Sequence, residues 1–234
     1  MKPPSFATAA WILFVKDLTI ELRTREIVTT GGFFAALVAV LTSVAFHAGA
    51  TQTARVAPGA IWLSIAFASI LAVGRTWQRE REDSALTALL LAPIPRASIF
   101  VGKALGVLVF LALVEVLVIP LVALLLHVDL TRVGPGLAPV LVLGTVGVAA
   151  TGTLFGAMTV RTRARDLVLA TVLFPLLSPA LVTGVAATKD LCAAANVGLA
   201  LDLAELGDYL LLLGVFDVVA VAGGLGLFGL LMEE

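Results

Sequence analysis

The stretch RTWQREREDSALTALLLAPIPRASIFVGK, residues 75–103, decides how this chain folds. It is the only long stretch in which charged residues cluster between two strongly apolar runs. Its charged first part leads into the short apolar run SALTALLLAP, which starts at Ser84 and is closed by Pro93 and Pro95, because proline cannot continue a helix. We therefore expect a short apolar helix that charged flanks hold at a membrane surface.

The composition also indicates a membrane protein. Of the 234 residues, 60% are hydrophobic and 13% are charged, whereas a soluble domain carries about 25% charged residues. The net charge of −1 gives no reason to expect nucleic-acid binding. A single cysteine, Cys192, excludes an intrachain disulfide and a cysteine-based metal cluster. We predict one all-α integral membrane domain over residues 1–234.

Residues 6–26 are predicted to form an amphipathic helix that lies along the membrane surface. Trp11, Val15, Leu18 and Leu22 recur at helical spacing and form an apolar face. The same segment carries charges that would be costly in lipid: Lys16, Asp17, Glu21, Arg23, Arg25 and Glu26. The alternative is that this segment lengthens the first membrane span.

Six apolar segments follow, and each approaches or exceeds the roughly 20 residues that cross about 30 Å of hydrocarbon. They cover roughly residues 31–47, 58–74, 104–126, 135–160, 167–187 and 209–232. Between the last two spans, residues 191–206 are apolar enough to predict a short helix lying on the membrane surface.

The distribution of basic residues predicts the orientation. With both termini in the cytoplasm, twelve of the fifteen Lys and Arg residues fall inside: Lys2, Lys16, Arg23, Arg25, Arg75, Arg79, Arg81, Arg96, Lys103, Arg161, Arg163 and Arg165. Only Arg55, Arg132 and Lys189 fall outside. This excess of positive charge on the cytoplasmic side predicts a multi-pass protein with both termini inside.

On this topology residues 75–103 form a cytoplasmic loop that could dock on a partner protein. We expect its charges, Arg75, Arg79, Glu80, Arg81, Glu82 and Asp83, to carry the second span into water, with Arg79 paired to Glu82 and Asp83. An apolar helix at residues 85–91 would enter a groove on the partner. The candidate contacts are Arg79, Glu82, Asp83, Leu86, Leu89, Leu90 and Pro93. The alternative is an ordinary charged loop.

The chain lacks the sequence motif of an ATPase. A phosphate-binding loop needs GxxxxGK[ST], but the one Gly-Lys pair, Gly102-Lys103, is followed by Ala104. If transport is driven by ATP, the nucleotide site must lie on another chain; otherwise the driver is an ion gradient. The sequence also lacks HExxH and GxSxG, so we predict a non-catalytic protein without catalytic or metal-binding residues.

Two acidic residues and three prolines lie inside predicted spans. Glu115 and Asp217 are costly at that depth, and such residues often line a substrate path or a subunit contact. The alternative is a protonated carboxyl group bonded to a neighbouring helix, or a misplaced span boundary. Pro120, Pro175 and Pro179 free backbone carbonyls, and we expect them to bend their helices.

His47 and His127 fall near the outer ends of spans, which raises the question of a shared metal or haem site. Two histidines on different helices, without further ligands, favour surface or interface positions instead. Gly152 and Gly156 form a GxxxG pattern that allows close helix approach.

Several stretches in order resemble the haem exporter protein B (CcmB) family, the permease-like subunit of the bacterial cytochrome c maturation apparatus. They are ARVAPGAIWL at residues 54–63, the loop from Arg75 to Asp83 with LTALLLAPIP and Lys103, LGTVG with FGAM, and FPLLSP. Together they cover nearly the whole chain.

The resemblance implies an elbow helix, six spans and a coupling helix between spans two and three, in an ABC-2-type permease architecture. It implies a homodimer in the bacterial inner membrane on two copies of an ATP-binding subunit. The further partners it implies are a haem-handling membrane protein, a small single-span subunit and a periplasmic haem chaperone, with haem as a handled substrate rather than a bound cofactor. The alternatives are an ABC-2-type permease for a lipid, glycan or drug, and a membrane scaffold that transports nothing.

Overall fold

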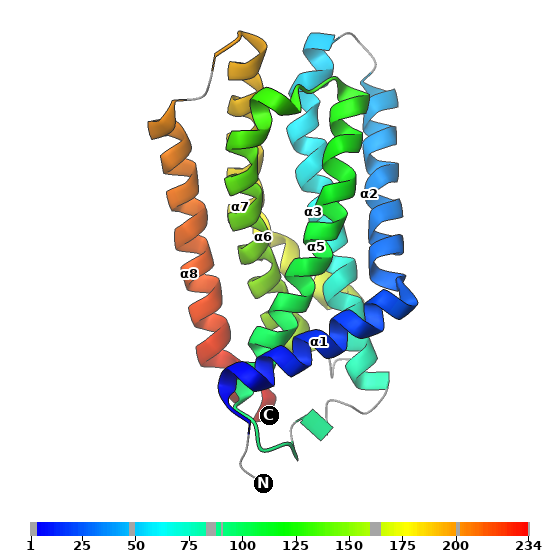
Figure 1. Cartoon of the computed structure of the whole chain (residues 1–234), viewed down its shortest axis with the longest axis vertical. Coiled ribbons are helices and arrows are strands. Elements are labelled where there is room, and N and C mark those ends of the chain that lie inside the picture. Colours follow the sequence, from blue (N-terminus) through cyan, green and yellow to red (C-terminus); the bar gives the residue numbers. More distant parts are fainter. Residues whose placement is uncertain are drawn as a thin grey trace.

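The computed structural model describes residues 4–46, 50–82, 88–89, 91–159, 165–199 and 202–233, and the regular secondary structure in these residues is all helical. Figure 1 shows one helix lying across a bundle of long helices. In chain order they are α1 (Phe6–Thr24), α2 (Glu26–Ala45), α3 (Ala50–Glu82), α5 (Arg96–Leu126), α6 (Leu130–Thr159), α7 (Arg165–Asn196) and α8 (Leu203–Glu233). The predicted all-α fold is confirmed.

Six helices of the described chain, α2, α3 and α5 to α8, are long and apolar enough to cross a membrane. The prediction of six spans after an N-terminal crossing helix is therefore confirmed. Because six spans are an even number, the chain begins and ends at the same end of the bundle, which we call the terminal end (Figure 1). The opposite end is called the far end.

The spans are longer than their apolar segments. The second was predicted over residues 58–74, but α3 extends from Ala50 to Glu82 and includes the charged start of the loop. The predicted surface helix at residues 191–206 is wrong. Its first part continues α7 as far as Asn196, Gly198 then adopts a positive φ of 76°, and α8 begins at Leu203. A glycine in this left-handed conformation ends a helix readily.

Helices α3 and α6 form the centre of the bundle, and they bury more of their surface than the other spans. The indole of Trp62 on α3 fits against two glycines: a Cβ added at Gly144 of α6 or Gly184 of α7 would lie 2.4 or 2.3 Å from it. The indole N–H donates a hydrogen bond of 2.9 Å to Thr188. Close approach at small residues is what holds helices together in lipid, where apolar surface alone gives little preference for a protein neighbour.

The predicted close approach at Gly152 and Gly156 is also present. Cβ atoms at these positions would lie 2.7 Å from Val73 and 2.5 Å from Trp77, both on α3. The GxxxG pattern of α6 therefore packs within the chain, on the turns of α3 that lead toward the terminal end.

The three prolines lie inside helices that continue through them. Pro120 is in α5, and Pro175 and Pro179 are in α7. Pro179 leaves the carbonyl of Pro175 without its helical donor, and the hydroxyl of Ser178 donates to that oxygen at 2.7 Å. The effect of the prolines on helix direction remains a prediction.

Candidate functional site

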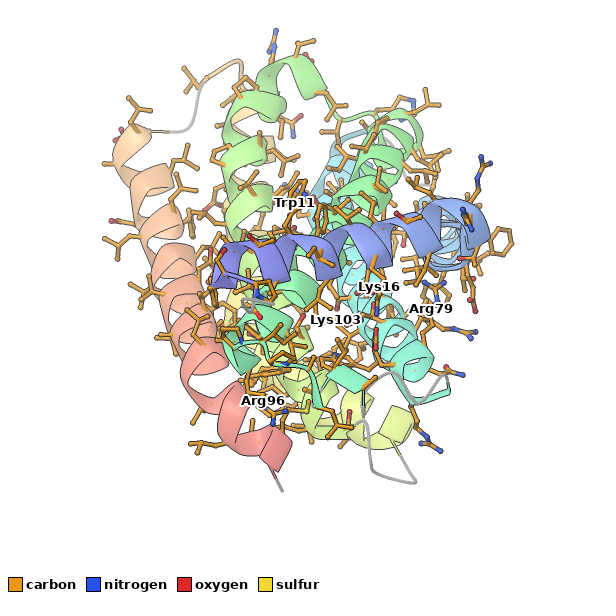
Figure 2. All side chains as sticks on the ribbon, turned by 60° about the horizontal axis from the view of Figure 1, so that its bottom comes forward. Trp11, Lys16, Arg79, Arg96 and Lys103 are labelled. Carbon is orange, nitrogen blue, oxygen red and sulfur yellow. The ribbon has the colours of Figure 1, made fainter. Side chains whose placement is uncertain are left out.

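The candidate site lies where α1 crosses the bundle at the base of the loop between α3 and α5 (Figure 2). Of the predicted docking residues, Asp83, Leu86, Leu90 and the side chain of Glu82 lie outside the described residues. Leu89 is half-buried against the apolar core, and Pro93 is exposed. Leu91, in the apolar centre of the loop, is 81% exposed. The docking role of these residues stays a prediction.

The last turns of α3 do not simply carry charge into water as we expected. Glu80 is only 3% exposed, and Lys103 of α5 is only 1% exposed. The Lys103 ammonium donates to a Glu80 carboxylate oxygen and, at 2.7 Å, to Asp17 of α1. Lys16 of α1 donates to the same Glu80 oxygen and lies 3.4 Å from Asp17. We call Lys16, Asp17, Glu80 and Lys103 the ion cluster.

The ion cluster is electrically balanced, with two ammonium groups and two carboxylates. Burial alone would lower the pKa of Lys16, but the adjacent Asp17 and Glu80 carboxylates outweigh it and raise that pKa above its usual value. Balance matters because a buried charge that loses its partner is strongly destabilising. The four side chains therefore hold three helices together as a unit.

Arg79 of α3 makes a second connection, to α1 and to the start of α2. Its guanidinium lies 3.0 Å from Glu21 and 3.3 Å from Glu26, and it donates to Thr24 at 3.0 Å. Glu21 is itself buried, and its other oxygen accepts the first backbone N–H groups of α2 at 2.7 and 2.9 Å. Arg79 thus fixes the corner between α1 and α2. Its predicted pairing with Glu82 and Asp83 involves side chains outside the described residues.

Helix α1 presents its charged stripe to the protein and its apolar face outward. Asp17 and Glu21 are buried on the stripe that also holds Ala10 and Leu13. Trp11 is 61% exposed, and Figure 2 shows it on the other side of α1 from Lys16. The other exposed large apolar residues of α1 are Phe6, Ile12, Val15 and Leu22. An apolar outer face suits a helix at the membrane surface, as predicted.

A glycine allows this crossing. A Cβ at Gly102 of α5 would lie 2.8 Å from the backbone oxygen of Ala10 and 2.8 Å from the side chain of Leu13. The backbones of α1 and α5 therefore approach closely beside Lys103, which brings its ammonium within reach of Asp17. Sequence reasoning counted Lys103 among the cytoplasmic basic residues and the family-like residues, and rejected Gly102-Lys103 as a phosphate loop, but it missed this role. The available signal was the i, i+4 pair of acids, Asp17 and Glu21, opposite the apolar stripe.

The two intramembrane acids are buried inside the bundle, and both face α6. Glu115 of α5 accepts a hydrogen bond from the Thr145 hydroxyl. Asp217 of α8 packs against Gly147, where a Cβ would lie 2.5 Å from its carboxylate, and neither of its oxygens has a hydrogen-bond partner in the described chain. Glu115 lies twelve residues beyond Lys103, about 18 Å along the helix, so these acids form no part of the ion cluster.

The histidines do not come together with other ligands in the described residues. His47 lies outside them. His127 ends α5 with a positive φ of 57° and lines a polar pocket of about 290 Å³ at the far end, with Asp129, Arg132 and Cys192. Within the described chain no three His, Cys, Asp or Glu side chains are placed to hold a metal.

Comparison with known proteins identifies the family. The family model described as CcmB protein matches residues 8–225. The chain belongs to this family. Heme exporter protein B of Rhodobacter capsulatus is 33% identical over 180 residues, 74% of this chain and 78% of that protein. Heme exporter protein B of Pseudomonas aeruginosa is 31% identical over 200 residues, 85% of this chain and 88% of that protein.

A third relative, Heme exporter protein B of Bradyrhizobium diazoefficiens, is 29% identical over 182 residues, 78% of this chain and 82% of that protein. The region that matches the CcmB family takes in most of α1, the loop and all four members of the ion cluster. The ion cluster at the base of the loop therefore lies within the part of the chain that matches the family model. The predicted resemblance is confirmed.

Proposed function

We propose that this chain is the membrane permease subunit of an ATP-driven complex that delivers haem to the periplasm for c-type cytochrome biogenesis. ATP hydrolysis resides on a separate subunit, because the chain has no phosphate-binding loop. Relatives named Heme exporter protein B support haem as the handled substrate. The observation that carries the coupling role is the ion cluster, which joins both sides of the loop to the crossing helix.

The coupling mechanism follows from the position of that cluster. Glu80 lies on the last turns of α3, before the loop, and Lys103 lies on the third turn of α5, after it. Both bond to α1, so a partner that displaces the loop moves α1, α3 and α5 together. The exposed Leu91 is available for the partner's groove. The loop thus receives the movement of the partner, and the three joined helices carry that movement into the bundle.

The proposed setting is the bacterial inner membrane with both termini in the cytoplasm, as the excess of basic residues at the terminal end indicates. The chain acts as a homodimer with two copies of the ATP-binding subunit. A haem-handling membrane protein, a small single-span subunit and a periplasmic haem chaperone complete the pathway. Whether ATP moves haem through this chain or drives its release to the chaperone, the same loop receives the force.

Co-purification tests the docking role. A tagged chain should bring down an ATP-binding subunit from its native membrane, and Leu91→Glu should reduce the recovered subunit at least several-fold. The matched control is Leu203→Glu, at a leucine that is 84% exposed at the far end. Equal loss of the subunit in both variants, or full retention in Leu91→Glu, would contradict docking through this loop.

A second experiment separates coupling from a scaffold role. An ATP-binding subunit that binds but does not hydrolyse ATP should abolish holo-cytochrome c formation while the complex still assembles. Normal cytochrome c maturation with that subunit would leave this chain as a scaffold. Loss of lipid, glycan or drug export with unchanged cytochrome c would instead indicate a permease for another substrate.

A further inference from the structure

A small cavity lies between α1 and α3, where the ion cluster meets the corner that Arg79 fixes (Figure 2). It has a volume of about 30 Å³ and is lined by residues of α1, α3 and α5. Most of the lining side chains are polar: Lys16, Asp17, Thr76, Arg79 and Glu80. A polar cavity beside buried charges can hold a hydrogen-bonding ligand.

Two buried polar atoms in the cavity wall need such a ligand. Glu80 accepts hydrogen bonds from both ammonium groups of the ion cluster on one carboxylate oxygen, Oε1. Its other oxygen, Oε2, and the Thr76 hydroxyl have no hydrogen-bond partner among the residues that the structure describes. Both side chains belong to residues that are only 3% exposed. A polar group buried to this extent is destabilising unless it is hydrogen-bonded.

The spacing of these two residues allows one molecule to reach both. Thr76 and Glu80 are four residues apart on α3, so their side chains are neighbours on one face of the helix. A ligand between them must donate a hydrogen bond to the carboxylate oxygen, and it can donate or accept at the hydroxyl. The wall therefore suits a small molecule that has both donors and acceptors.

Charge and size restrict the ligand further. The four charges of the ion cluster cancel, and the guanidinium groups of Arg75 and Arg79 are paired with Glu21 and Glu26. These groups therefore give no preference for an ion over a neutral molecule. About 10–15 Å³ is enough to hold one water molecule, so a cavity of about 30 Å³ has room for one or two.

We propose that this cavity binds water, which bridges Glu80 Oε2 to the Thr76 hydroxyl and connects the ion cluster with Arg79. The water completes the hydrogen bonds of Glu80 without adding a charge to a balanced cluster. A bond through water is nearly as favourable as a direct one, so α1 and α3 are joined here by solvent as well as by ion pairs. The proposal concerns the joint itself and does not depend on what the complex delivers.

Radiolytic footprinting tests the proposal on the full chain in nanodiscs. A short X-ray pulse makes hydroxyl radicals from bound as well as bulk water, and a radical oxidises the side chain beside it. Phe110 reports on the cavity, because it lines the wall and is only 1% exposed. The matched reporter is Phe100 of the same helix, which is also 1% exposed and does not line the cavity. With a radical scavenger in the bulk solvent, mass spectrometry should show several-fold more oxidation of Phe110 than of Phe100.

Substitutions of Thr76 provide a second readout. Thr76→Val keeps the shape of the side chain and removes its hydroxyl, so the water loses one of its partners. The oxidation of Phe110 should then fall several-fold, toward that of Phe100. Thr76→Ser keeps the hydroxyl and should retain the oxidation of Phe110.

Three results would overturn the proposal. The first is equal oxidation of Phe110 and Phe100 in the native chain, a comparison that needs no variant. The second is undiminished oxidation of Phe110 in Thr76→Val. The third is a monovalent cation as the occupant, shown by a Tm that rises when sodium or potassium replaces choline in the native chain but not in Thr76→Val.

Discussion

Replacing Lys103 with methionine tests the ion cluster most directly. The change removes an ammonium that is 1% exposed and leaves Asp17 and Glu80 close together. Breaking a buried ion pair from one side costs about 3–5 kcal/mol. Lys16 remains beside both carboxylates, so we expect a loss near the lower end, about 3 kcal/mol.

The assay is thermal unfolding of the purified chain in detergent. For a domain of this size each kcal/mol corresponds to about 2–4 °C, so Lys103→Met should lower the Tm by about 6–12 °C. Trp77 reports on the site, because its ring centroid lies 5.9 Å from the Lys103 ammonium nitrogen. Intrinsic fluorescence should therefore show the change at this end of the bundle.

A double variant distinguishes charge from packing. Lys103→Met combined with Glu80→Gln removes one charge of each sign and leaves Lys16 paired with Asp17. It should recover more than half of the lost Tm. The control is Arg132→Gln, which breaks an exposed pair with Asp129 and should leave the Tm unchanged. A Lys103→Met shift no larger than this control, or no recovery in the double variant, would refute the reasoning.

Three further changes have defined outcomes. Gly184→Ala places a methyl group 2.3 Å from the Trp62 indole and should cost about 1–3 kcal/mol, measured as a lower Tm. Thr145→Val removes the hydroxyl that donates to Glu115 and should cost about 1–3 kcal/mol in the same assay. Arg79→Gln should accelerate amide hydrogen exchange at the corner of α1 and α2, because the bonds to the acids of that corner are lost.

Matched controls make these outcomes decisive. Gly214→Ala adds the same methyl group at an open position and should not change the Tm. Glu115→Gln keeps a hydrogen-bonding side chain opposite Thr145 and should be milder than the threonine change. Arg79→Gln could instead leave amide hydrogen exchange unchanged, or accelerate it at the far end alone. Either result would contradict the role of Arg79 in holding the corner between α1 and α2.

The architecture could be predicted from the sequence because membrane spans are encoded locally. A run of apolar residues of sufficient length must cross the membrane as a helix, so the six spans and the crossing helix followed from residue types alone. Helix ends were less predictable. The predicted surface helix failed because the local backbone turn at Gly198 divided an apolar stretch whose composition gave no break.

The ion cluster could not be predicted, because its bonds join residues far apart in the chain. Asp17 and Lys103 are 86 residues apart, and Glu80 and Lys16 are 64 apart. From sequence spacing alone, Arg79 is expected to pair with acids three and four residues away. In the fold it pairs with Glu21 and Glu26 instead. Which of these partners lies within reach depends on where α1 crosses the bundle.

The inward-facing charges of α1 explain why ion pairs, added to the packing of Ala10 and Leu13 at Gly102, fix the position of this helix. Its outward face, on which Trp11 is 61% exposed, points away from the bundle. The contacts that position α1 on the bundle must therefore come from its inner stripe. Apolar packing in lipid gives little preference for one neighbour over another. Ion pairs between fixed partners are directional, and Asp17 meets Lys103 at 2.7 Å across the close approach at Gly102. On the proposed coupling role, a force on the loop would reach α1 through these bonds.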